Sequence, residues 1–137
     1  SLVAALALGA IGVQMGTRFL CATETPIHPR VKDCIVKAGD RETVVTGRCT
    51  GHPVRVIKNK LARELLRLDQ ENKPEELEKL GTGKLRLAMQ EGDLEWGSVM
   101  SGQGAGLVHE IKPAADIIKE VVSEAAQILK TLPQYIS

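Results

Sequence analysis

The longest apolar run of this 137-residue chain lies at its very beginning, from Leu2 to Val13. It covers about a dozen positions, fewer than the roughly twenty that a membrane-spanning helix needs, so we expect it to be buried in protein. Residues 2–8 predict the last turns of a buried helix that Gly9 ends, and Gly12–Met15 predicts a very short, fully buried strand. No basic residue or Met precedes the run, which argues against a signal peptide. We therefore expect Ser1 to be an internal position of a longer chain.

The length and composition are those of a folded domain without an obvious charged partner. A chain of 137 residues is one ordinary domain or a piece of a larger one, well short of the roughly 250 residues of a complete (β/α)₈ barrel. Lys and Arg number 18 against 17 Asp and Glu, so the net charge of +1 gives no field to attract nucleic acid or a membrane surface. Aromatic residues make up only 2%, too few for the stacking platforms of single-strand binders.

Cysteine and histidine do not form a pattern that binds metal. The residues are Cys21, Cys34, Cys49, His28, His52 and His109. The cysteines are odd in number and form no CxxC pair, so we expect reduced thiols in a cytoplasmic protein. The histidines lack metal-ligand spacing, and we expect no metal site.

The periodicity predicts a mostly helical chain with one small β-element. Two β-branched runs at 43–46 and 54–57, separated by glycines, predict a small hairpin or extended excursion. Apolar residues at helical spacing predict helices over 30–38, 58–71, 74–80 and 84–91, and a long C-terminal helix that has Pro113 in its first turn. The wide apolar stripe of that last helix indicates that it packs on something large.

The first glycine-rich segment, Gly9 to Leu20, predicts a strand that enters a tight Gly16-Thr17 turn and then a helical turn. Glycine permits close approach to the backbone, Thr17 adds a hydroxyl, and a helix N-terminus favours negative charge, so this turn is a candidate phosphate cradle. The alternative, which spacing alone favours, is an ordinary strand-to-helix turn that needs glycine for its backbone angles.

The second glycine-rich segment runs from Gly97 to Leu107 and is too dense in glycine for the interior of a strand or helix. Its GxGxG pattern is not a dinucleotide fingerprint, because no strand leads into it and no acidic residue follows at the required distance. We therefore expect a loop, either one that approaches a ligand or a tight connection between packed helices.

Basic residues gather in the middle of the chain, at Arg48, Arg55, Lys58 and Lys60. Such a cluster is typical of a solvated face, and the alternative is a surface for an acidic partner.

Three stretches, in this order, resemble one known family. They are AALALGAIGVQMGTRFL, VVTGRCTGHPVRVIKNKLARELL and EGDLEWGSVMSGQGAGLVHEIKPAADIIKEVV. Together they are similar to the C-terminal part of the FMN-dependent enoyl-acyl-carrier-protein reductase II family, within the nitronate monooxygenase and 2-nitropropane dioxygenase superfamily. The first stretch fits both branches of that superfamily, whereas the middle stretch and the GSVMSGQGAGLV loop point to the reductase branch.

The resemblance implies an α/β fold that is the C-terminal portion of a (β/α)₈ barrel, mostly helical in this chain, with a barrel that this chain alone does not close. On this basis residues 1–27 hold the last barrel strand and the phosphate-binding turn. Residues 28–96 form a helical and extended excursion, and residues 97–137 hold the glycine-rich loop and the C-terminal helix.

The resemblance also implies the site. The family's phosphate-binding turn, which holds FMN, matches Gln14, Met15, Gly16 and Thr17, with the amides of Gly16 and Thr17 as direct donors. A loop near the flavin and the substrate mouth matches Ser98, Met100, Gly102 and Gln103. The family's catalytic histidine lies in an earlier barrel loop, so we expect no catalytic residue in this chain and none of its histidines as a replacement.

The function that the resemblance implies is reduction of a trans-2-enoyl thioester, carried on acidic acyl carrier protein, by NAD(P)H through FMN in fatty acid biosynthesis. The basic cluster then becomes a docking surface for the carrier or a nucleotide phosphate. The alternatives are a nitronate monooxygenase that uses FMN and oxygen, and a non-catalytic half-barrel that binds a partner. We expect this chain by itself to be inactive and to associate, for example as a homodimer, through exposed apolar surface.

Overall fold

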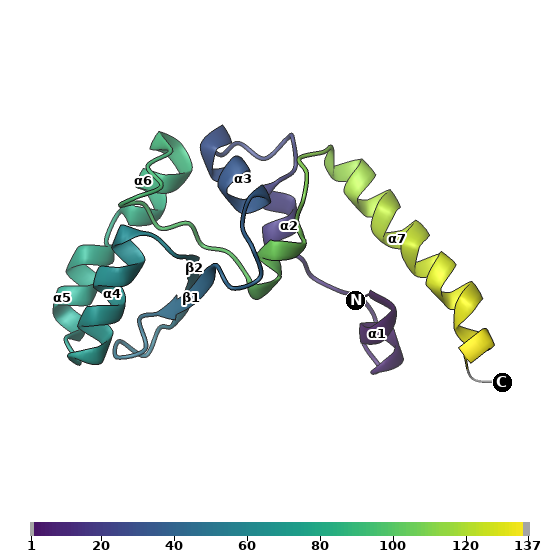
Figure 1. Ribbon diagram of the computed structural model, residues 1–137, viewed down its shortest axis with the longest axis horizontal. Helices are drawn as coiled ribbons and strands as arrows, with labels where there is room; N and C mark the ends of the chain where they lie inside the picture. Colours follow the sequence, from purple (N-terminus) through teal and green to yellow (C-terminus); the bar gives the residue numbers. More distant parts are fainter. Residues whose placement is uncertain (1, 136–137) are drawn as a thin grey trace.

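The computed structural model describes residues 2–135, which form a hairpin, several short helices and a long C-terminal helix that projects away from the hairpin (Figure 1). Its α-helices are α1 (Leu2–Ala7), α2 (Thr17–Leu20), α3 (Pro29–Val36), α4 (Lys60–Gln70), α5 (Pro74–Gly81), α6 (Lys84–Glu91) and α7 (Ala114–Thr131). Two 3₁₀ helices, η1 (Gln103–Leu107) and η2 (Leu132–Tyr135), and two strands, β1 (Thr43–Thr46) and β2 (Val54–Ile57), complete the described elements. The predicted hairpin and helices are confirmed, with helix ends shifted by at most two residues.

The hairpin is widened by the second glycine-rich segment. β1 and β2 pair antiparallel, with Thr46 opposite Val54, and Val56 forms an isolated antiparallel bridge with Met100. Hydrogen bonds join Ile57 N to Val99 O at 2.9 Å and Ser101 N to Arg55 O at 3.1 Å. The expectation of a loop throughout 97–107 was therefore wrong for residues 98–101, which run beside β2 as a strand-like segment. We call β1, β2 and residues 98–101 the ribbon.

The ribbon has two different faces, because successive side chains of extended backbone point to opposite sides. On one face, Ile57 and Val99 join the main core, where they pack with Val31 and Ile35 of α3. The other face carries Thr46, Val54 and Met100 and is turned toward a second apolar cluster. That cluster consists of Leu61, Leu65, Leu68 and Leu77 from α4 and α5.

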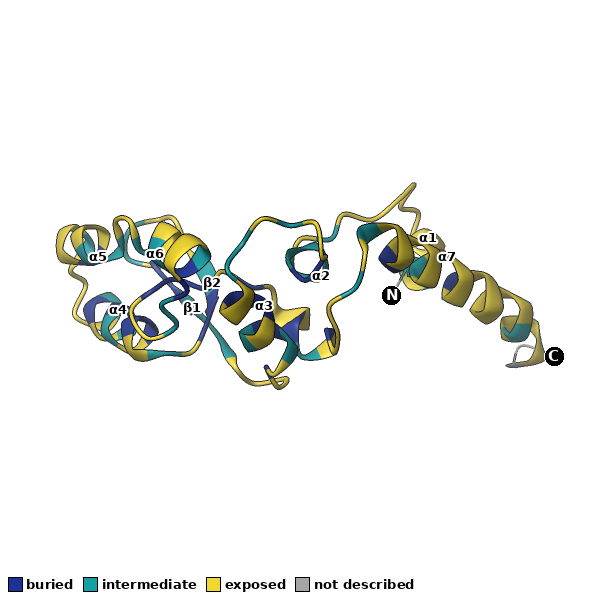
Figure 2. Ribbon diagram, turned by 90° about the horizontal axis from the view of Figure 1, so that it is seen from above, coloured by how far each residue is buried: buried dark blue, intermediate teal, exposed yellow. Residues whose placement is uncertain are grey.

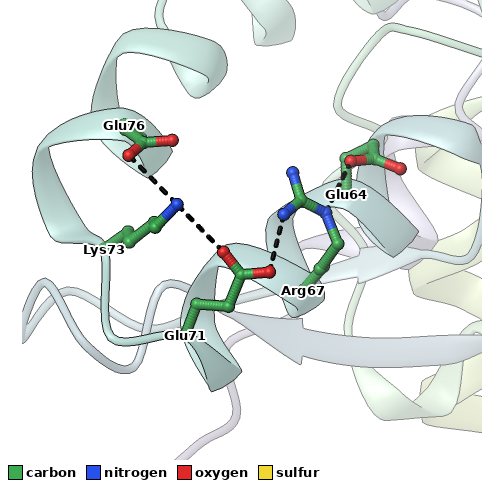
Figure 3. Close-up of polar contacts among 5 residues, drawn as sticks. All are labelled: Glu64, Arg67, Glu71, Lys73 and Glu76. Atoms are coloured by element: carbon green, nitrogen blue, oxygen red, sulfur yellow. Dashed lines mark hydrogen bonds and ion pairs between the residues drawn. The ribbon is translucent and has the colours of Figure 1, made fainter.

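A chain of exposed charges joins α4 to α5 (Figure 3). Arg67 contacts Glu64 at 3.1 Å and Glu71 at 2.7 Å, and Lys73 contacts Glu71 at 3.1 Å and Glu76 at 3.4 Å. Solvent screens each pair, so the individual contributions are small. The pairs follow one another along the corner between α4 and α5, beside the leucine cluster.

The last helix, α7, is attached through its beginning. The Glu24 carboxylate accepts hydrogen bonds from the Ala114 amide at 3.2 and 3.0 Å, and Ala22 forms a parallel bridge with Lys112. Pro113 occupies the N-cap rather than the first turn. Beyond this attachment α7 contacts α1, and the two helices project away from the other elements (Figures 1 and 2). No helix among residues 2–135 combines the length and apolar character needed to cross a bilayer.

Two expectations for the start of the chain were wrong. α1 forms as predicted, but none of its residues is buried (Figure 2). Residues 12–15 form no strand, and Val13 is 45% exposed. A strand exists only where neighbouring backbone satisfies its amides and carbonyls, and the described residues place no such neighbour beside this segment.

Candidate functional site

The two glycine-rich segments meet at Thr17. The Gly102 amide donates a hydrogen bond to the Thr17 hydroxyl at 2.8 Å, across 85 positions of sequence. A Cβ placed on Gly102 would lie 3.4 Å from the same oxygen, at the limit of ordinary van der Waals contact. The structure therefore brings this residue of the second segment to the predicted phosphate turn.

The turn offers unused backbone donors. The Gly16 carbonyl accepts from the amides of Phe19 at 2.9 Å and Leu20 at 3.1 Å as α2 begins. Within residues 2–135, the amides of Gly16 and Thr17 donate to no acceptor. A Cβ added at Gly16 would meet nothing within 4 Å, so the space beside this turn is open. Free amides with open space are the chemistry that an anionic oxygen requires.

Two cavities, of about 290 Å³ and about 670 Å³, share Gln14 and Met15 in their walls. We call the larger one the turn cavity. It extends from Gly16 to η1 and to Glu120 and Glu124 of α7. Sequence reasoning predicted Gln14, Met15, Gly16 and Thr17 for this site and missed other lining residues, among them Arg18, His109 and Glu110.

Two of the three carboxylates on the wall of the turn cavity are paired with a lysine. Lys112 Nζ contacts Glu110 at 2.6 Å and Glu120 at 2.9 Å. These hydrogen bonds, first to Glu110 and then to Glu120, raise the pKa of Lys112, and the bond to Lys112 lowers the pKa of Glu110. Arg18 Nη1 donates to the Glu110 carbonyl at 3.0 Å, which leaves its other N–H groups available. An anion at the turn thus faces amides and a guanidinium, beside two carboxylates that are paired with Lys112 and a third, Glu124, that forms no ion pair among the described residues.

The residues predicted for the flavin mouth do not all lie together. Gly102 is at the turn, but Ser98 and Met100 line a different cleft, against the leucines of α4 and α5. Gln103 begins η1 with an exposed side chain, and Gly104 rather than Gln103 lines the turn cavity. The four residues predicted for the flavin mouth therefore do not line one cavity. Two of them line the cleft against α4 and α5, and the chain continues from there to the turn.

The predicted basic cluster is spread along the hairpin. Arg48 lies in the turn after β1, and Lys58 follows the far end of β2, so the length of a four-residue strand, about 13 Å, separates the two ends. Lys60 is already paired with Glu95 at 2.6 Å. These residues do not form one compact patch. Elsewhere in the described chain, no three His, Cys, Asp or Glu side chains come together as metal ligands.

Comparison with known proteins identifies the family. The family model "Nitronate monooxygenase" matches residues 1–124. The chain belongs to the nitronate monooxygenase family. It is 36% identical over 129 residues to a probable nitronate monooxygenase of Staphylococcus saprophyticus and 30% identical to one of Staphylococcus aureus, covering 93% of this chain in both cases. The chain spans 36% of the length of these relatives.

Solved structures of the same family match as well. FabK from Thermotoga maritima superimposes with a TM-score of 0.92 at 48% sequence identity, over 97% of this chain and 42% of that chain. A nitroalkane oxidase from Streptomyces ansochromogenes superimposes with a TM-score of 0.74 at 27% identity, over 96% of this chain and 37% of its own. The fold expectation is confirmed: the described residues form a helix-rich α/β structure that matches part of a (β/α)₈-barrel family protein, and their two-stranded sheet closes no barrel.

Proposed function

We propose that the protein containing this chain is an FMN-dependent oxidoreductase that reduces a trans-2-enoyl thioester on acyl carrier protein with NAD(P)H. The observation that carries the proposal is the hydrogen bond from the Gly102 amide to the Thr17 hydroxyl, which puts both glycine-rich segments beside one cavity. Support for the reductase branch comes from the 48% identity with FabK, an enoyl-acyl-carrier-protein reductase II. The three free cysteines agree with the cytoplasmic location that belongs to this proposal.

The residues present fit the phosphate of FMN. The amides of Gly16 and Thr17 have no acceptor in the described chain, and the space beside Gly16 is open. In the proposed site these two amides hold the phosphate, and Arg18 adds positive charge at the cavity wall. Gln14 and Met15 line the cavity immediately before the turn.

In the proposed site, the residues of this chain bind FMN and orient the substrate toward it. FMN, when bound, supplies hydride transfer between the nicotinamide and the enoyl carbon. The Gly102 amide holds the Thr17 hydroxyl oxygen, which leaves the hydroxyl proton free to donate toward the cavity. The same contact places the second glycine-rich segment where a substrate can approach without a side chain in the way. We assign no proton transfer to this chain.

A nitronate monooxygenase is the second candidate, because the family model and the staphylococcal relatives bear that description. It would use the same flavin site with oxygen as the oxidant. A third candidate is the non-catalytic half-barrel, which would bind a partner through the exposed apolar surface of α7.

Assays of the complete protein that contains this sequence distinguish the three candidate functions. We expect it to purify with FMN absorbance and to oxidise NADH or NADPH when a crotonyl thioester is added. Oxygen uptake with a nitronate and no enoyl reduction would instead establish the second candidate. A folded, flavin-free monomer would establish the third.

The phosphate turn is tested by Thr17→Val, which keeps the side-chain shape and removes the hydroxyl. We expect this variant to bind FMN about three- to tenfold more weakly, the effect of one lost hydrogen bond. Thr131→Val, at the end of α7 and away from the cavity, is the matched control. Equal FMN affinity in both variants would show that the Thr17 hydroxyl does not contribute to FMN binding.

Docking of acidic acyl carrier protein on the basic residues is tested by Arg48→Glu combined with Lys58→Glu. If these residues attract the carrier, the KM for the acyl carrier protein substrate rises while the KM for a small crotonyl thioester does not change. Unchanged KM values for both substrates would exclude this docking surface.

A further inference from the structure

A second cleft, of about 410 Å³, lies between the ribbon and the leucine cluster of α4 and α5. We call it the ribbon cleft. Its volume is within the usual range for a small-molecule site. Its floor is buried and mostly apolar, with Leu61, Leu65 and Leu77, whereas Leu85 and Met100 at its rim are exposed by 43% and 37%.

One polar group in this floor has no partner. Thr46 is only 1% exposed and lines the ribbon cleft, and its hydroxyl makes no hydrogen bond within the described part of the chain. A buried hydroxyl of this kind is costly to the fold and therefore unusual. Thr43, on the same strand but the other face, shows the usual situation, since its hydroxyl accepts from Arg55 at 3.2 Å. The Thr46 hydroxyl is therefore a hydrogen-bonding point available to a ligand.

The ribbon cleft lies close to the turn cavity. Met100 lines the ribbon cleft, and Gly102, two residues later, donates to Thr17 at the turn. Two residues of extended chain span at most about 7 Å. Because the same segment borders both cavities, a slender ligand in the ribbon cleft can extend along it toward the flavin proposed at the turn.

We propose that the ribbon cleft binds the pantetheine arm of a thioester substrate, an inference that rests on the proposed reductase function. The arm is linear and alternates amide groups with short aliphatic segments. The leucines suit its aliphatic segments, and the hydroxyls of Thr46 and Ser98 suit its amides. A purely aliphatic acyl chain would fill the same space but leave the buried Thr46 hydroxyl without a partner, so the chemistry of the floor favours the arm.

Binding is measured on the complete protein that contains this sequence, in its flavin-free form, by NMR titration with pantetheine and separately with octanoate. We expect pantetheine, and not octanoate, to shift the amide signals of residues 46, 54, 77 and 98. Thr46→Val should weaken pantetheine binding about three- to tenfold, the effect of one hydrogen bond. The matched control is Thr43→Val, the same change on the other face of the same strand, which should bind pantetheine as the unmodified protein does.

Thr46→Val is not expected to unfold the protein, since it replaces an unpartnered buried hydroxyl by a methyl group of similar size. Ser98→Ala provides a second variant at the other polar point of the cleft. Binding of octanoate with no response to pantetheine would overturn the proposal, as would equal pantetheine affinities for the Thr46 and Thr43 variants. The titration needs neither flavin nor turnover, so its failure is distinguishable from failure of the reductase assay.

Discussion

Asp69 of α4 holds the turn of the hairpin. Its carboxylate accepts hydrogen bonds from the Gly47 amide at 2.7 Å and the Cys49 amide at 2.9 Å. Burial, the largest single influence, raises the pKa of Asp69, but hydrogen bonds from Cys49, Arg48 and Gly47 together outweigh it, and the pKa lies below its ordinary value. The carboxylate therefore stabilises the fold above about pH 4, the unfolded pKa, and loses this effect as the pH falls through the folded pKa.

We expect Asp69→Asn to lower the free energy of unfolding at neutral pH by about 1–3 kcal/mol, because an amide offers only one oxygen to the two backbone donors. The variant should also show less further loss of stability below about pH 4 than the unmodified protein. Urea unfolding across this pH range measures both effects. Asp116→Asn, which disturbs only an exposed contact to Lys119 at 3.8 Å, should leave stability almost unchanged.

Gly106 lets η1 lie directly against the chain at Asp40. A Cβ at this position would be 2.6 Å from Asp40 Oδ1 and 2.9 Å from the Asp40 backbone nitrogen. The backbone atom cannot move aside as a side chain can, so we expect Gly106→Ala to destabilise the protein by about 1–3 kcal/mol in thermal unfolding. Gly104→Ala is the control in the same 3₁₀ helix, where the nearest atom, Leu107 Cδ1, is 3.9 Å away. Equal melting temperatures for the two variants would contradict this packing.

At the scale of elements, α7 depends on a cap supplied by a distant residue. Its N-cap is Pro113, which provides no side-chain hydrogen bond, and Glu24 accepts from the Ala114 amide instead. That bond is the main reason why the pKa of Glu24 is lowered. We expect Glu24→Gln to speed hydrogen exchange in the first turn of α7, and the unmodified protein to lose the same protection as the pH falls through the Glu24 pKa. Glu91→Gln, at the end of α6, should not change exchange in α7.

The elements that could be predicted from the sequence are those with local causes. The hairpin follows from two β-branched runs and from Gly47 and Gly51, whose φ angles of +80° and +78° favour glycine. Residues 12–15 were predicted wrongly because a strand depends on backbone neighbours that periodicity does not reveal. The strand-like segment 98–101 was not predicted. The many glycines around it obscure the alternation of side chains between two faces, which buries Val99.

The candidate site was predictable to a similar degree. Glycine density pointed to Gly16 and Gly102 separately, and the structure adds the contact between them through Thr17. Arg18, His109 and Glu110 reach the turn cavity only through tertiary packing, and no spacing in the sequence marks them.

At the scale of the whole molecule, apolar side chains are unevenly covered. The body around the ribbon has two buried clusters, whereas the projecting α1 and α7 and the segment between α1 and α2 are mostly exposed (Figure 2). Leu8 and Ile11 are exposed by 90% and 106%. Surface of this kind is typical of an interface, and because the chain spans 36% of the length of its relatives, the residues that cover it can belong to the rest of a longer protein or to a second copy.

The outer face of α7 is the surface through which we expect two copies of the chain to associate. Ile118, Val122 and Leu129 are all more than half exposed and recur at helical spacing, while Ile117 and Ala125 face inward. We expect the protein to sediment with a mass that rises with concentration, and Val122→Glu to shift it toward the monomer, because a charge in an apolar contact must be desolvated without a partner. Ser123→Glu introduces the same charge one position along, on an exposed polar site, and should leave association unchanged. A monomer at every concentration, with both variants alike, would show that this face is not used between copies of the chain.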